Sequence, residues 1–117
     1  MDRDYKFYPR KRILVAFIKD LEISLDLSSY MKNPVLLLNN EHHKIVGKAL
    51  RLEWRKKGLW GEFYIGQFGD ARYVTDQLKK KHYIELSCGY IPTLDDSAAE
   101  LVEISMFLKE GEGINDQ

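Results

Sequence analysis

The chain has 117 residues, and its 18 basic and 18 acidic side chains cancel to a formal net charge of zero. This balance argues against partners that are bound mainly by charge, such as nucleic acid held by phosphate attraction or an anionic membrane surface. The single cysteine, Cys88, excludes an intrachain disulfide and a zinc site made of several cysteines.

The length predicts one domain with a real core, and we expect it to span residues 1–117. Its core should lie within residues 12–108, with a flexible, polar tail over 110–117. No apolar run reaches the roughly 18 residues of a membrane-spanning helix, and the first residues are unlike a signal peptide. We therefore expect a soluble, intracellular protein without a membrane partner.

The N-terminal third of the chain predicts strands. Residues 12–18 form a short apolar, partly β-branched run, as in a buried strand. Residues 21–27 alternate between apolar and polar side chains, as in a strand with one exposed face. Residues 35–38 are all apolar and predict a strand covered on both faces, followed by a polar loop over 39–43. Residues 1–10 and 28–34 are expected to be a lead-in and a connection.

The remainder predicts a hairpin, a helix and two more strands. Residues 45–54 and 59–65 should pair as a hairpin around a basic turn that ends in glycine. A helix should start at Asp70, its expected N-cap, and end at the lysines 79–81. Further strands are expected over 84–91 and 101–108. About seven strands and one main helix predict a mainly β fold, with a closed or nearly closed antiparallel barrel that hides the strand edges.

Ser87 is the first candidate for chemistry. In the strand over 84–91 it lies on the face opposite Ile84 and Leu86, and Gly89 on its own face would let a substrate or a partner backbone come close. Most serines on strands are surface hydroxyls, so this one needs a base and a group that orients the base.

Three histidines and one carboxylate could complete such a set. His42 and His43 follow an apolar strand, whereas His82 has the opposite strand parity to Ser87 and is the weaker candidate. Glu103 interrupts an apolar strand, so its carboxylate must be solvated or paired. Two loop histidines without a role and a solvated glutamate are the ordinary alternative.

Four segments, in order, resemble the prohead maturation proteases of tailed bacteriophages, serine peptidases distantly similar to herpesvirus assemblin. The match covers roughly residues 12–108. The segments are an apolar strand that enters a histidine segment and then a glycine, over 35–48; a Gly-Leu step at 58–59; a helix followed by Leu-Ser-Cys-Gly-Tyr at 86–90; and Glu-Ile-Ser-Met at 103–106.

The resemblance implies Ser87 as the nucleophile and Glu103 as the residue that orients the base. The family has a histidine at a set distance before its glycine, and counting back from Gly47 without a gap gives Asn40, which cannot act as a base. His42 becomes the base if the loop is two residues shorter, a shift that keeps strand parity, and His43 is the second choice. Backbone amides near Cys88 and Gly89 are the candidate oxyanion donors.

The resemblance implies a serine endopeptidase that acts inside an assembling phage prohead in the host bacterial cytoplasm. It would cleave the scaffold protein or the scaffold-like segment of the major capsid protein, and also itself. A homodimer or higher homo-oligomer is implied, and no cofactor or metal. The shortness of the chain and the departure at Asn40 favour an alternative, an inactive relative that keeps the fold as a capsid-assembly or structural domain.

Overall fold

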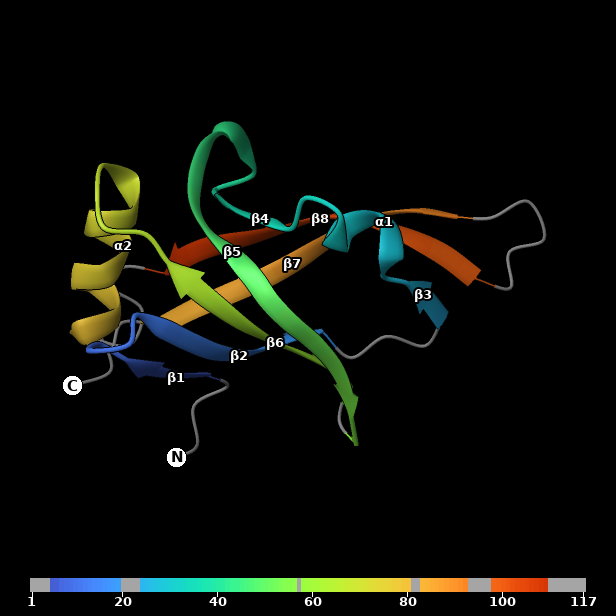
Figure 1. The fold of residues 1–117 in the computed structure, drawn as a ribbon, viewed down its shortest axis with the longest axis horizontal. Coiled ribbons are helices and arrows are strands. Elements are labelled where there is room, and N and C mark those ends of the chain that lie inside the picture. Colours follow the sequence, from blue (N-terminus) through green and yellow to red (C-terminus); the bar gives the residue numbers. More distant parts are fainter. Residues whose placement is uncertain (1–4, 20–23, 57, 81–82, 93–97, 110–117) are drawn as a thin grey trace.

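The computed structural model describes residues 5–19, 24–56, 58–80, 83–92 and 98–109. Within these ranges it contains eight strands and two helices (Figure 1). The strands are β1 (Tyr5–Tyr8), β2 (Ile13–Lys19), β3 (Ser24–Asp26), β4 (Val35–Leu38), β5 (Glu41–Arg55), β6 (Gly58–Ile65), β7 (Tyr83–Pro92) and β8 (Ala98–Lys109). The helices are α1 (Ser28–Met31) and α2 (Asp70–Lys79).

All eight strands belong to one mixed sheet. Its order is β1-β2-β6-β5-β4-β8-β3, and β7 pairs with β8 outside this path. The predicted mainly β fold is confirmed. The predicted closed antiparallel barrel is not, because no ladder in the described ranges closes the sheet and β8 runs parallel to both β3 and β4.

Strand β8 is central to this arrangement. One of its edges carries β7, and the other carries β3 beside residues 98–100 and β4 beside residues 104–106. Figure 1 shows β5 and β6 crossing over β7, so the sheet folds back on itself, and β2 contacts β7. A core of buried apolar side chains lies within it. Fully buried members of this core include Leu14, Leu36, Leu59, Phe63, Ile65, Val74, Leu101, Ile104 and Met106.

Helix α2 stands at one end of the sheet and is held there by Arg12. The guanidinium donates hydrogen bonds to the carbonyl oxygens of Ile65 and Gly66 and, at 2.8 Å, to Thr75 Oγ1. Val74 and Leu78 on the same helix are buried in the core. A charged side chain and an apolar helix face together fix α2 against the end of β6.

Several predicted boundaries differ from the structure. The expected lead-in contains β1, which pairs with β2, and the expected connection contains α1. Of the strand expected over 21–27, only Ser24–Asp26 is observed, and residues 21–23 lie outside the described ranges. Helix α2 begins at Asp70, so its N-cap residue is Gly69, with φ of 60°, rather than Asp70. The tail over 110–117 also lies outside the described ranges.

Neither described helix has the length and apolar character needed to cross a membrane.

Candidate active site

The hairpin of β4 and β5 carries His42 and is closed by a turn of only two residues. Asn39 and Asn40 have φ of 54° and 62°, the signs that a type I′ turn requires and that asparagine tolerates better than most residues. Leu38 pairs with Glu41 directly across this turn. The prediction of a loop over 39–43 is therefore wrong, because His42 and His43 already belong to β5.

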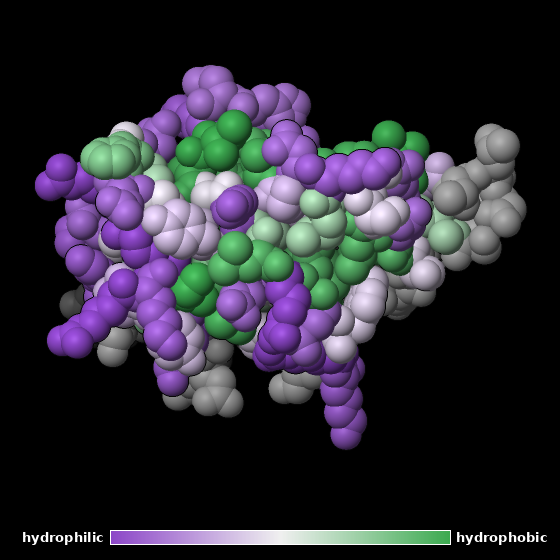
Figure 2. Space-filling view, viewed as in Figure 1, coloured by the Kyte–Doolittle hydropathy of each residue, from purple (hydrophilic) through white to green (hydrophobic). Residues whose placement is uncertain are grey.

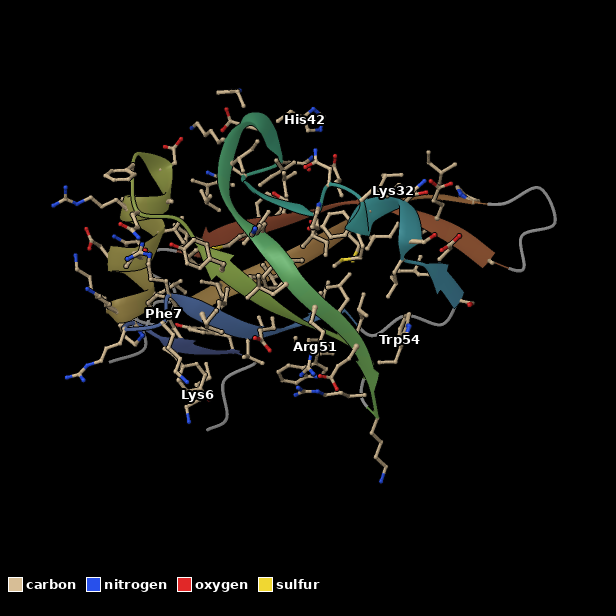
Figure 3. All side chains as sticks on the ribbon, viewed as in Figure 1. Lys6, Phe7, Lys32, His42, Arg51 and Trp54 are labelled. Carbon is tan, nitrogen blue, oxygen red and sulfur yellow. The ribbon has the colours of Figure 1, made fainter. Side chains whose placement is uncertain are left out.

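The start of β5 bulges away from β4. Leu38 pairs with Glu41 but Leu37 pairs with Ile45, so residues 42–44 have no partner on β4. Extra residues in one strand redirect side chains that would otherwise alternate regularly. Here the bulge lets His42, at the end of the hairpin (Figure 3), approach β8, although β4 separates β5 from β8 in the sheet.

His42 meets Glu103 of β8. The His42 Nε2 atom lies 2.9 Å from Glu103 Oε1, within hydrogen-bond range, and the two side chains are 79% and 25% exposed. His43 instead has its Nε2 atom 3.6 Å from Oε1 of Glu41, its neighbour on the same strand. Of the two candidate bases, the structure pairs His42 with the candidate orienting carboxylate.

Ser87 and Glu103 lie on one face of the β7–β8 ladder. Ser87 is directly opposite Ser105, and Gly89 is directly opposite Glu103. Because partners in an antiparallel ladder share a face and alternate residues return to it, Ser87, Gly89, Glu103 and Ser105 all project from the same side. Ser87 is thus diagonal to Glu103, a relation that separates two residues by about 7–8 Å and their β-carbons by somewhat less.

Gly89 leaves the space that the Glu103 side chain occupies. A β-carbon at position 89 would lie 2.8 Å from Glu103 Cγ and 3.4 Å from its Cδ. The glycine therefore admits the Glu103 side chain over β7. The sequence suggested that Gly89 would admit a substrate, and in the structure it admits a side chain of the site itself.

The structure brings His42 and Glu103 into contact, but no contact joins the candidate nucleophile to the candidate base in the described part of the chain. Ser87 is partly buried, and within the described residues no hydrogen bond joins its hydroxyl to His42. Since Glu103 engages Nε2, the Nδ1 atom of His42 is the ring nitrogen left to accept a proton from serine.

The other candidates have different positions. The Asn40 side chain is exposed in the hairpin turn, while its backbone N–H donates to Ser105 Oγ at 2.7 Å. Cys88 is partly buried and lies opposite Ile104, on the face that packs into the core. His82 lies outside the described residues. The roles of Ser87, His42, Glu103, Cys88 and Gly89 in catalysis stay predictions.

Sequence reasoning missed Ser105. Its side chain is 1% exposed, and its hydroxyl accepts the Asn40 N–H and donates to the Leu37 carbonyl at 3.4 Å. The signal was available, because a serine in the Glu-Ile-Ser-Met segment has the same strand parity as Glu103. That parity implies a place on the site face of β8.

A separate apolar pocket of about 500 Å³ lies on the other flank of the β4–β5 hairpin and includes none of the candidate residues. Figure 2 shows hydrophobic residues at the surface beneath the polar hairpin tip. Ile45 and Phe68, 54% and 84% exposed, are among the pocket residues. Within the described ranges, no group of three or more histidine, cysteine, aspartate or glutamate side chains could hold a metal ion.

Comparisons of this chain with protein-family models, with curated proteins and with solved structures find no significant match.

Proposed function

We propose that this protein is a serine endopeptidase in which Ser87 is the nucleophile, His42 the general base and Glu103 the group that orients the base. The observation that carries the proposal is the 2.9 Å contact between His42 and Glu103. These residues are 61 positions apart, and the contact joins two strands that are not neighbours in the sheet. Ser87 lies on the same face as Glu103, because it is two residues before Gly89, the ladder partner of Glu103.

The proposed chemistry is acyl transfer. His42 Nδ1 takes the proton from Ser87 Oγ as that oxygen attacks the peptide carbonyl carbon. Glu103 stabilises the imidazolium that forms, and His42 then gives its proton to the leaving amine as the C–N bond breaks. Water, activated by the same imidazole, hydrolyses the ester and restores Ser87. Backbone N–H groups near Cys88 and Gly89 would donate to the oxyanion.

The ordered motifs support a role in phage capsid maturation. We infer that the substrates are the scaffold protein or the scaffold-like segment of the major capsid protein, together with the chain itself. The site of action would be the assembling prohead in the bacterial cytoplasm, and the active form a homo-oligomer. We also propose an assemblin-like sheet that is nearly closed, because β2 and β7 contact each other without a ladder between them in the described ranges.

A second candidate function follows from the same geometry. The His42 side chain is 79% exposed and has no hydrogen bond to Ser87 within the described residues. This observation favours an inactive relative that keeps the protease fold as a capsid-assembly or structural interaction domain. The two candidates differ in the reactivity of one hydroxyl.

That reactivity can be tested with an alkyl fluorophosphonate. Attack by an activated serine forms an O–P bond and expels fluoride, and the serine proton passes to the base. We expect one adduct per chain, mapped by peptide mass spectrometry to Ser87. Ser87→Ala should abolish it, whereas Ser29→Ala, an exposed serine on α1, should leave it unchanged.

The result that would overturn the peptidase is equally specific. An adduct that persists in Ser87→Ala would exclude Ser87 as the nucleophile. A wild-type protein that takes up no label, while a known serine hydrolase in the same tube is labelled, would favour the inactive relative.

A further inference from the structure

We infer that Ser105 is a positioning residue, whose buried hydroxyl holds the His42-bearing hairpin in register with Glu103 and Ser87. This inference rests on the proposed function and deepens it. Ser105 neither touches His42 nor takes part in the proton transfers. Its effect on the reaction would pass through the β4–β5 turn.

The Ser105 hydroxyl contacts the β4–β5 hairpin at two backbone groups. Ser105 Oγ accepts a hydrogen bond from the Asn40 backbone N–H at 2.7 Å, and it faces the Leu37 carbonyl oxygen at 3.4 Å. Asn40 lies after β4 and Leu37 within it, so one side chain of β8 contacts both ends of this short segment. At 1% exposure the hydroxyl is shielded from water, which makes such a bond costly to lose.

In the β7–β8 ladder, Ser105 lies beside two of the three candidate residues. It is directly opposite Ser87 and two residues from Glu103, so all three side chains belong to one face of β7 and β8. The hairpin residue that it holds, Asn40, is two residues before His42. The hydroxyl therefore links the segment that carries the base to the strand that carries the orienting carboxylate.

The hairpin itself makes few contacts that would hold His42 in place. Residues 42–44 have no ladder partner on β4, and the His42 side chain is 79% exposed. Besides the Glu103 contact, the nearby attachments to β8 are the bond from Asn40 to Ser105 and one from the Asn39 N–H to the Met106 carbonyl at 2.9 Å. Strand β4 is paired with β8 up to Leu38, so loss of the Ser105 bond would release the Asn40 side of the turn, which leads into His42, from β8.

The test uses two substitutions of the same serine. Ser105→Ala removes the hydroxyl, and Ser105→Cys fills its space with a slightly larger thiol that is only a weak hydrogen-bond donor and acceptor. A matched control is Thr75→Val in α2. It also removes a buried hydroxyl, one that accepts a hydrogen bond from Arg12. For each protein, the fluorophosphonate reaction at Ser87 is resolved into a binding constant and a maximal labelling rate.

We expect Ser105→Ala and Ser105→Cys to lower the maximal labelling rate at least tenfold, with the binding constant within about twofold of the wild type. Amide hydrogen exchange at Asn40 should accelerate by a similar factor in both. Thr75→Val should lower the melting temperature but keep the labelling rate of the folded protein. An equal fall in labelling rate in Ser105→Ala and Ser105→Cys would indicate that Ser105 acts through its hydrogen bonds, because cysteine still fills the space and alanine does not.

Two failures are distinguishable. If the wild type is labelled at Ser87 and Ser105→Ala or Ser105→Cys is labelled just as fast, the positioning role is excluded and the peptidase stands. If the wild type is not labelled at all, the proposed function fails and the positioning role falls with it, even where the exchange at Asn40 accelerates.

Discussion

Gly89 shows how a missing side chain can be part of a site. The atom nearest to an added β-carbon is Glu103 Cγ at 2.8 Å, which belongs to a flexible, partly exposed side chain. Because Glu103 can move aside, the fold tolerates a β-carbon at position 89. The same movement takes the Glu103 carboxylate away from His42. A small residue here is therefore required by the site more than by the fold.

Gly89→Ala is expected to separate activity from stability. Because Glu103 has to turn away from His42, the rate of fluorophosphonate labelling at Ser87 should fall at least tenfold. The free energy of unfolding, measured with urea, should change by less than about 1 kcal/mol. Gly61→Ala is the matched control.

In that control, a β-carbon would lie 2.6 Å from two atoms of the buried Phe63 ring and 3.1 Å from Ile18 Cδ1. Overpacking of this kind costs about 1–3 kcal/mol, with no effect on labelling of the folded protein. Normal labelling of Gly89→Ala would show that the Glu103–His42 contact is dispensable.

Tyr30 connects α1 to the start of β4 through one hydrogen bond. Its hydroxyl donates to the Val35 carbonyl oxygen at 2.6 Å, and the ring is 3% exposed. Burial raises the pKa of the Tyr30 phenol well above its usual value, and the nearby Cys88 thiol raises that pKa further. The folded protein therefore keeps this phenol protonated at a pH where the unfolded chain ionises.

Tyr30→Phe should lower stability at neutral pH and remove part of its loss at alkaline pH. Losing the hydrogen bond costs about 1 kcal/mol. Since the raised pKa belongs to the folded state, wild-type stability from this group is complete below about pH 10 and then falls by about 1.4 kcal/mol per pH unit. The difference between the two proteins in urea unfolding should shrink between pH 9 and pH 11. A difference that stays constant or grows over this range would contradict a buried, protonated phenol.

At the scale of an element, the β4–β5 hairpin determines where the candidate base His42 lies. Its two asparagines occupy left-handed backbone conformations, and the Asn40 contribution to the site is its backbone N–H rather than its side chain. A residue that favours the same conformation and keeps the N–H should preserve the hairpin. A β-branched residue should not, because left-handed backbone is strongly disfavoured for such side chains.

Asn40→Gly should therefore stabilise the protein by about 0.5 kcal/mol and Asn40→Val should destabilise it by about 1–2 kcal/mol. Thermal unfolding at fixed pH measures both. Labelling at Ser87 should survive in Asn40→Gly within about twofold, since glycine also supplies the N–H. A large loss of labelling in Asn40→Gly would mean that the asparagine side chain acts in the candidate site.

At the scale of the whole molecule, local patterns predicted most elements but not their pairing. The apolar run over 35–38, the hairpin around Gly58 and the periodic helix face all carry short-range signals, and the structure has these elements. The parallel pairing of β8 with β3 and β4 joins segments far apart in the sequence, and no local pattern encodes it. The need to hide strand edges favoured a closed or nearly closed antiparallel barrel. The structure has one mixed sheet instead, and no ladder in the described ranges closes it.

The site was predictable to a similar degree. Residue type and parity placed Ser87 and Glu103 on one side of their strands. Parity also selected His42, but through a continuous strand that does not exist, because the turn at Asn39 and Asn40 and the bulge over 42–44 replace it. The sequence did not indicate a role for Ser105, because its hydrogen bond depends on the β4–β5 hairpin packing over it. That packing appears only in three dimensions.

Three distant segments have to act as one set if Ser87 is an activated nucleophile, and the labelling rate of Ser87 in two histidine variants tests this most directly. His42 and His43 are adjacent and similarly exposed at 79% and 76%, so each is a matched control for the other. We expect His42→Ala to lower the fluorophosphonate labelling rate at Ser87 about 100-fold or more, and His43→Ala to leave it within about twofold. Equal rates in the wild type and His42→Ala, or a loss confined to His43→Ala, would contradict the assignment of His42 as the base.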